Sequence, residues 1–236
     1  MFAQLTALLA AAMTFLARYR RKRRRLLPAR AVIVSPRRST VIDDRGAVRS
    51  VQSAELTLSA EDLERLWITA NLQNLGRTYW LFLTKVTLGL IRVVYGAHER
   101  SVVLLGRPLT LLRFDAPEYT IESGHGHISW QILDGLLVAR SGRGCGKLAL
   151  DVRRLEVDAQ GRGRLRIEVE VANFYPAIAA GFSMPVYKLT QSYMHVLVTH
   201  AFLRSLATLD LAESRVGPFA VAPGPLATEE VSQNGR

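Results

Sequence analysis

The sequence predicts an α+β fold in which an antiparallel sheet is followed by a long C-terminal helix. Between residues 101 and 172, apolar runs of strand length alternate with turn residues, among them Gly124-His125-Gly126 and Asp134-Gly135. These connections are too short for parallel crossovers, so the strands that they join are antiparallel. From Pro185 to Leu211 the apolar residues recur at spacings of three and four, which indicates a helix with one buried face.

The positive charge of the chain is concentrated at its N-terminus. The full sequence of 236 residues holds 31 Lys and Arg against 20 Asp and Glu, a net charge of +11. The ten basic residues before Asp43, the first acid, account for most of it and leave 21 basic against 20 acidic residues in the remainder. A nearly neutral body does not favour a nucleic-acid-binding domain, which carries Lys and Arg over one folded face. The single cysteine, Cys145, excludes an internal disulfide framework and a Cys-rich zinc site.

Residues 1–25 form a separate hydrophobic and polybasic segment. Residues 2–17 are uncharged and rich in Ala and Leu, which predicts an apolar helix outside the folded domain. At about 1.5 Å per residue this helix would be about 24 Å long, marginal for a bilayer core of about 30 Å. The basic cluster comes directly after it and comprises Arg18, Arg20, Arg21, Lys22, Arg23, Arg24 and Arg25.

The order of these two features predicts where the segment acts. A cleavable signal peptide has its charges before the apolar stretch, whereas here they follow it. The cluster is therefore expected at the cytoplasmic face of a membrane, against anionic lipid. Two alternatives stay open: a removable organelle-targeting segment on a soluble protein, or a basic tail that binds nothing.

The elements of the body follow in order. Residues 26–47 contain Pro28 and Pro36 and are predicted to be a linker, and Val48–Leu58 is predicted to be a strand. Ser59 can cap a helix that ends at Asn74-Leu75-Gly76.

Beyond that helix, Tyr79–Gly96 is apolar almost all round. It is predicted to be a buried helix in preference to a membrane span, because Lys85 and Arg92 lie inside it. Strand is the alternative for part of it because of its β-branched residues. The later strands are predicted at Val102–Leu105, Leu109–Phe114, Tyr119–Ser123, His127–Leu133, Leu136–Arg140, Lys147–Val157 and Arg164–Ala172. Residues 212–236 are expected to be a flexible tail.

This order of strand, helices, antiparallel meander and long final helix, over residues 48–211, resembles the START-like (Bet v 1-like, SRPBCC) superfamily. The resemblance implies a curved sheet that grips the final helix, the helix-grip architecture. It also implies a cavity between the two that takes a hydrophobic small molecule or lipid. It does not imply catalysis, because most members are binding proteins and a minority are cyclases or hydrolases. Tyr79–Gly96 departs from the pattern, since members more often have two short helices there.

Large aromatic side chains are the candidates for the cavity wall, although such rings equally fill cores. The candidates are Trp67, Tyr79, Trp80, Trp130, Tyr187 and Tyr193. His195 falls on a polar stripe of the final helix that faces either solvent or a ligand head group, and His200 falls on its apolar face. The expected function is non-catalytic binding of a hydrophobic ligand at a membrane surface.

Two alternatives come from other functional classes. An enzyme of the same fold would use His195 or His200 as a base, within reach of the cavity and of an acid such as Asp134 or Glu122. A structural or interaction protein would have a filled core and a basic tail that contacts lipid or nucleic acid.

No cofactor or metal is predicted, and no sequence feature indicates the oligomeric state. The glycine-rich run from Ser141 to Lys147 lacks the spacing of a phosphate-binding loop. The His125-x-His127 pair is interpreted as part of a turn rather than as a metal site.

Overall fold

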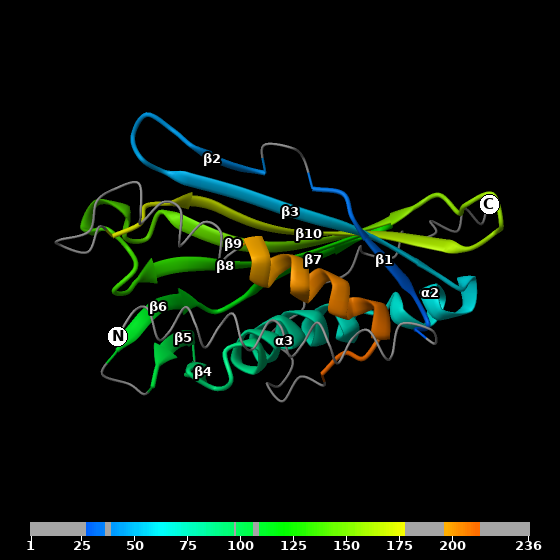
Figure 1. Cartoon of the computed structure of the whole chain (residues 1–236), viewed down its shortest axis with the longest axis horizontal. Coiled ribbons are helices and arrows are strands. Elements are labelled where there is room, and N and C mark those ends of the chain that lie inside the picture. The colour runs from blue at the N-terminus through cyan, green and yellow to red at the C-terminus, as the bar shows by residue number, and fades with distance from the viewer. Residues whose placement is uncertain (1–26, 36–38, 97, 106–108, 178–195, 213–236) are drawn as a thin grey trace, which may run out of the picture.

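The structure, a computed structural model, describes residues 27–35, 39–96, 98–105, 109–177 and 196–212. Within these residues the chain forms a ten-stranded, curved, open antiparallel sheet (Figure 1). The strands follow the order β1-β3-β10-β9-β8-β6-β5-β4, with β2 also paired to β3 and β7 to β8. Their bounds are Arg30–Ile33 (β1), Thr40–Ile42 (β2), Val48–Leu58 (β3), Ile91–Tyr95 (β4), Glu99–Leu104 (β5), Thr110–Asp115 (β6), Glu118–Glu122 (β7), His125–Asp134 (β8), Gly146–Leu155 (β9) and Gly163–Phe174 (β10).

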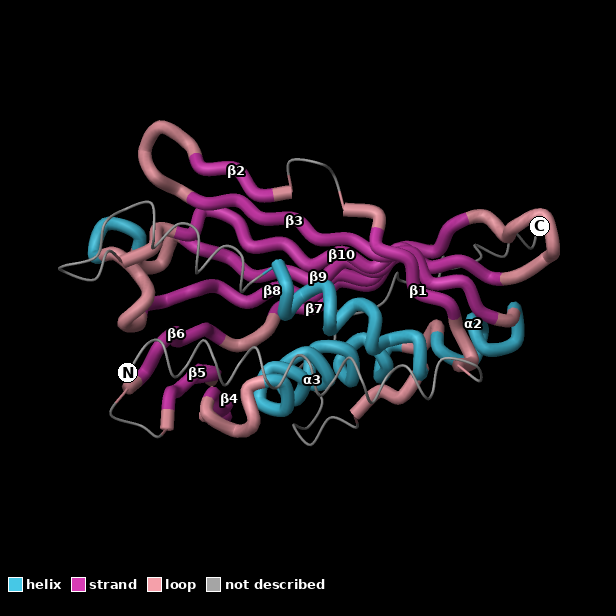
Figure 2. The backbone as a smooth tube through the Cα atoms, in the orientation of Figure 1, coloured by secondary structure: helices cyan, strands magenta, loops and turns pink. Residues whose placement is uncertain are grey.

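The helices cover one face of this sheet (Figure 2). They are α2 (Ala60–Leu66), α3 (Thr69–Val86) and residues 196–205 of the final helix, which a 3-10 turn, η2 (Leu206–Thr208), extends. Phe202 of the final helix packs edge-on against Tyr79 of α3 at a centroid distance of 5.1 Å. Leu203 and Leu206 are buried in the same core. The predicted architecture, an antiparallel sheet wrapped on a C-terminal helix, is therefore confirmed.

Strand β10 shows how the sequence pattern produces the two faces of the sheet. Leu165, Ile167 and Val169 are buried against the helices, whereas Arg166 and Glu168 alternate with them on the outer face. Side chains of a strand alternate between faces with a period of two. The alternation in the sequence therefore identified the wet face correctly.

The predicted end of the first helix at Asn74-Leu75-Gly76 is wrong. Helix α2 begins at its Ser59 cap, as predicted, with Ser59 Oγ accepting from Asp62 N at 3.0 Å, but it ends at Leu66. A new helix, α3, starts at Thr69 and runs through Gly76. Gly76 serves close packing rather than termination, because a Cβ there would lie 3.1 Å from Trp130 Cζ2.

The segment Tyr79–Gly96 is half helix and half strand. Helix α3 ends at Val86, and Leu88 (φ 53°) and Gly89 (φ 79°) then reverse the chain into β4. The prediction of a continuous buried helix was wrong, and the strand alternative holds for its second half. The β-branched residues of Ile91–Tyr95 suit the extended backbone.

Two further expectations differ from the structure. The stretch expected to be a linker, 26–47, holds β1 and β2, which both pair with β3. The predicted strand Leu136–Arg140 is irregular, with one isolated bridge from Val138 to Pro176, and a 3-10 turn, η1 (Arg140–Gly142), follows. The predicted N-terminal segment 1–25 lies outside the described residues, as does the tail from 213 onward.

Candidate functional site

A cavity of about 390 Å³ lies between one end of the sheet and the helices. Its sheet wall is formed by Leu56, Ile121, Gly126, Val152, Leu165 and Ile167. Its helical wall is formed by Leu66, Trp67, Ile68, Thr69, Asn71, Leu72 and Leu75. The segment after the final helix closes it with Leu206, Leu209 and Leu211.

The cavity wall is almost wholly apolar. Thr69 and Asn71 are the polar residues among the described lining, which includes no titratable side chain. The amide of Asn71 is already engaged, since its Nδ2 donates to Leu66 O at 3.1 Å and its Oδ1 accepts from Asn74 Nδ2 at 3.3 Å. A charged group placed here would lose its hydration with no described partner to replace it, which is costly. The cavity suits an uncharged, apolar molecule.

The opening of the cavity carries exposed apolar side chains. Ile68, between α2 and α3, and Ile121, on β7, both line the cavity and are exposed to solvent. Trp67 stands beside them under the guanidinium of Arg154, 5.7 Å from its ring centroid. Arg154 in turn forms an ion pair with Glu64 of α2. This contact between β9 and α2 holds the indole ring at the opening.

The structure separates the predicted aromatic candidates. Trp67 lines the cavity, as predicted, whereas Tyr79, Trp80 and Trp130 lie in an interlocked core cluster with Phe114 and Phe202. The Trp80 ring centroid lies 5.1 Å from that of Tyr79 and 5.3 Å from that of Trp130, with the rings edge to face. Burial raises the pKa of Tyr79 to about 12, so its phenol stays neutral. Tyr187, Tyr193 and His195 lie outside the described residues.

His200 joins the final helix to the sheet and does not line the cavity. Its Nε2 lies 2.7 Å from Oε1 of the fully buried Gln52 and 3.4 Å from Ser35 Oγ. Burial, with a contribution from Arg204, lowers the pKa of His200, which favours the neutral ring. A neutral imidazole with Nε2 protonated donates to the amide oxygen of Gln52.

Neither of the acids proposed for the enzyme alternative pairs with His200, and one of them is engaged elsewhere. Asp134 accepts from Arg113 Nε at 3.0 Å, and Glu122 is exposed on β7. The described residues therefore contain no pairing of His200 with Asp134 or Glu122.

Most of the cavity wall was missed by a search for aromatic rings. The lining is dominated by leucines from α2, α3 and the final segment, none of which was among the predicted wall residues. Leu209, in the left-handed region at φ 56°, turns the chain so that Leu211 also reaches the cavity. The apolar stripes identify such residues as buried, but not which of them face a void.

On the outer face of the sheet, His125 and His127 share one carboxylate. His125 Nε2 lies 2.7 Å from Asp151 Oδ1, and His127 Nδ1 lies 3.2 Å from the same atom. Partial burial by itself would raise the pKa of Asp151, but hydrogen bonds from His127 and His125 lower it. Both histidines lie on strand β8, which confirms the strand predicted from His127 and corrects the turn expected at His125. Among the described residues no group of His, Cys, Asp and Glu has an arrangement that would hold a metal ion.

No helix in the described ranges is both long and apolar enough to cross a bilayer.

Comparisons with known proteins find distant structural neighbours. No protein-family model matches the chain, and no curated protein matches it. An uncharacterised protein from Bacillus thuringiensis is 13% identical, with a TM-score of 0.31 over 69% of this chain and 99% of that one. Ara h 8.0201 is 12% identical, with a TM-score of 0.30 over 69% of this chain and 99% of that one. A norcoclaurine synthase from Thalictrum flavum, solved with a transition-state analogue, is 11% identical, with a TM-score of 0.27 over 72% and 96%. Similarity at this level assigns neither a family nor an activity.

Proposed function

We propose that this protein binds an uncharged, largely apolar small molecule or lipid chain in the cavity between its sheet and its helices. The observation that carries the proposal is the apolar lining of a void of about 390 Å³. Small-molecule sites occupy about 300–1,000 Å³ and are lined mainly by apolar groups. A void of this size also argues against the alternative of a filled core.

The lining favours binding over acid–base catalysis. A general base must lie within hydrogen-bond reach of the proton that it removes. The described wall offers no carboxylate, imidazole or amine, and His200 is committed to Gln52. Release of an unchanged ligand is therefore the expected outcome of binding.

The proposal is tested by native mass spectrometry of full-length protein purified from its source, with extraction and identification of any bound molecule. Val152→Phe places a ring in the cavity and should abolish co-purification, because Val152 lines the void. The matched control is Val157→Phe, at a largely exposed position beyond β9. Equal ligand occupancy in both variants would contradict the proposed site.

We further propose that residues 1–25 hold the protein at the cytoplasmic face of a membrane, with anionic lipid as partner. The support is the sequence order, an uncharged apolar stretch followed by the cluster Arg18–Arg25. Replacement of the seven basic residues of this cluster by Gln should reduce flotation of the full chain with anionic liposomes. Flotation equal to that of the native chain would end this part of the proposal.

A further inference from the structure

Exposed leucines gather at the end of the sheet that lies away from the cavity. Leu88 and Leu105 are 61% and 72% exposed, and Leu109 and Leu136 are exposed beside them. They belong to the turn between α3 and β4, the two flanks of the β5–β6 connection, and the turn after β8. We refer to Leu88, Leu105, Leu109 and Leu136 as the leucine end.

Backbone hydrogen bonds bring these residues together. Leu105 N donates to Leu90 O at 2.9 Å, which joins the first two connections. Leu104 N donates to Leu109 O at 2.9 Å, and Leu136 N donates to Thr110 O at 3.0 Å. The leucine end is therefore a continuous feature and not a set of scattered surface residues.

The backbone at two of these positions is unfavourable for leucine. Leu88 has φ 53° and Leu105 has φ 56°, in the left-handed region that Gly and Asn adopt most readily. Their side chains pack little against the core, since both are largely exposed. Folding alone would favour Gly or Asn at both positions. Strain of this kind, combined with an exposed apolar side chain, points to a contact outside the folded chain.

Exposed cations surround the leucine end. Arg92 Nε donates to Gly89 O at 3.1 Å, so its guanidinium stands beside Leu88, and Lys85 precedes the same turn. Arg140 and Arg143 are exposed in the loop between β8 and β9. Gly144 N donates to Leu133 O at 2.8 Å, which places this loop at the same end of the sheet.

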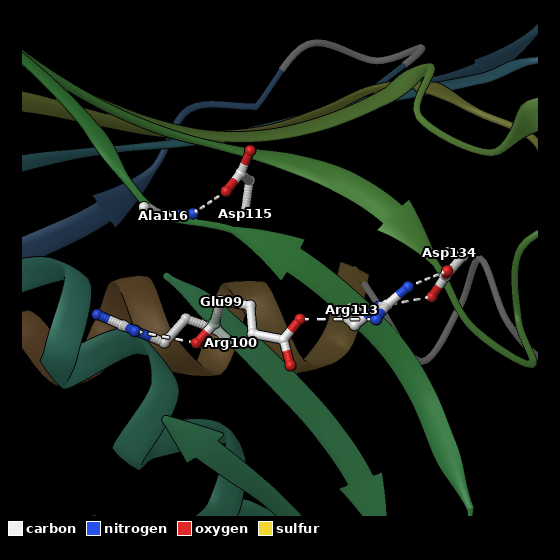
Figure 3. Close-up of polar contacts among 6 residues, drawn as sticks. All are labelled: Glu99, Arg100, Arg113, Asp115, Ala116 and Asp134. Carbon is white, nitrogen blue, oxygen red and sulfur yellow. Dashed lines mark hydrogen bonds and ion pairs between the residues drawn. The ribbon is translucent and has the colours of Figure 1, made fainter. Parts of the chain in front are cut away.

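The acid two residues before Leu136 is already paired. Asp134 points toward Arg113, which also faces Glu99 (Figure 3). The exposed acids Asp43 and Asp44 lie in the β2–β3 connection, at the opposite edge of the sheet from β4 and β5. The leucine end thus combines apolar side chains with uncompensated positive charge, which complements an anionic lipid surface.

We propose that the leucine end docks on an anionic bilayer surface, with Leu88 and Leu105 entering the boundary between headgroups and acyl chains. The cavity then faces away from the bilayer. Gly126, near the start of β8, lines the cavity, whereas Leu136 follows the end of the same strand. A strand of this length spans about 30 Å, so the opening at Trp67 faces the aqueous phase. This docking does not depend on what the cavity binds. It competes with attachment through Arg18–Arg25, because Ala29 N donates to Ala207 O at the cavity end and the four residues from Arg25 to Ala29 reach at most about 14 Å.

The orientation is tested with full-length protein that carries an environment-sensitive dye on one introduced cysteine, with the native Cys145 replaced by Ser. The dye at Leu105→Cys should shift to the blue on vesicles with about 30% phosphatidylserine. It should also be quenched by lipids that carry a quencher on the acyl chain. The dye at Gln160→Cys, in the exposed β9–β10 turn at the cavity end, should not respond. A silent dye at position 105 on vesicles that still carry the protein would overturn the proposal.

A second measurement separates docking from folding. Leu88→Asn with Leu105→Asn removes both apolar side chains and supplies a residue that tolerates positive φ. We expect about tenfold weaker partitioning onto anionic vesicles, with an unchanged or higher urea midpoint. The matched control, Val32→Asn with Val157→Asn, removes exposed apolar side chains elsewhere and should partition like the native chain.

Two outcomes of the second measurement would overturn the proposal. A lower urea midpoint in the leucine variant would show that the leucines pack against the chain itself. A blue shift of the dye at position 105 that grows with protein concentration, without vesicles, would show a second copy of the chain to be the partner.

Discussion

Gly76→Ala tests whether close packing or helix termination explains a glycine in the middle of α3. In an ordinary helix interior this change is stabilising by about 0.5–1 kcal/mol. Here the new Cβ would lie 3.1 and 3.2 Å from Trp130 Cζ2 and Cη2 and 3.3 Å from Ile128 Cδ1. The Trp130 ring is 2% exposed and packs edge-on against Trp80, so it cannot move away from the new Cβ unless Trp80 moves as well.

The two effects have opposite signs, and the packing cost is the larger. Overfilling a packed core costs about 1–3 kcal/mol, so we expect Gly76→Ala to be destabilising by about 1 kcal/mol net. Urea denaturation of the native chain and the variant measures the difference. Gln73→Gly, at a half-buried position of the same helix, serves as control and should cost about 1 kcal/mol by helix propensity alone.

A double-mutant cycle identifies the contact responsible. Trp130→Phe removes the two ring atoms that a Cβ at position 76 would touch. In that background Gly76→Ala should become neutral or stabilising, which corresponds to a coupling energy of about 1–2 kcal/mol. If Gly76→Ala stabilises the native chain by about 1 kcal/mol instead, the Trp130 ring is mobile and the packing explanation is refuted.

Three further changes test other contacts. Phe202→Ala should lower the free energy of unfolding by about 3–5 kcal/mol, because this fully buried ring packs the final helix against the core. Urea denaturation measures the change. A loss below about 1 kcal/mol would show that the helix does not pack through this ring. Because the folded-state pKa of His200 lies below its ordinary value of 6.5, the unfolded chain takes up the proton first and stability should fall as pH drops below that value. Thermal melts across this range should show a shallower fall in His200→Gln, which keeps a donor for Gln52, and an unchanged slope would rule out His200 as the source. Gly135→Ala should abolish soluble expression, since its Cβ would lie 2.2 Å from Leu111 O at φ 139°, and a well-folded variant would contradict that geometry.

Local patterns in the sequence were sufficient for much of the sheet. Strand β3 has the predicted bounds Val48–Leu58, and β10 has the predicted alternation. The Ser59 cap also forms as predicted. Each of these features depends on neighbouring residues, whose spacing follows directly from the repeat of a strand or a helix turn.

Features that depend on residues far apart in the chain could not be predicted in this way. Gly76 looks like a helix end until Trp130, 54 positions later, is seen against it. Residues 26–47 look like a linker until β3 is present as a template for pairing. In both cases the decisive contact joins segments that the sequence does not show to be adjacent.

The candidate site shows the same division most clearly. The apolar alternation of β10 marks Leu165 as buried, but the same pattern would be seen for a side chain that fills a core and for one that borders a void. The difference depends on the separation between the sheet and the helices, which the aromatic cluster around Trp80 sets at one end. At the other end the described lining is mainly leucine, with Trp67 as its aromatic ring, and a cavity of about 390 Å³ remains. Composition and periodicity thus predict which face is buried, and the spacing of the packed layers determines whether a ligand has room there.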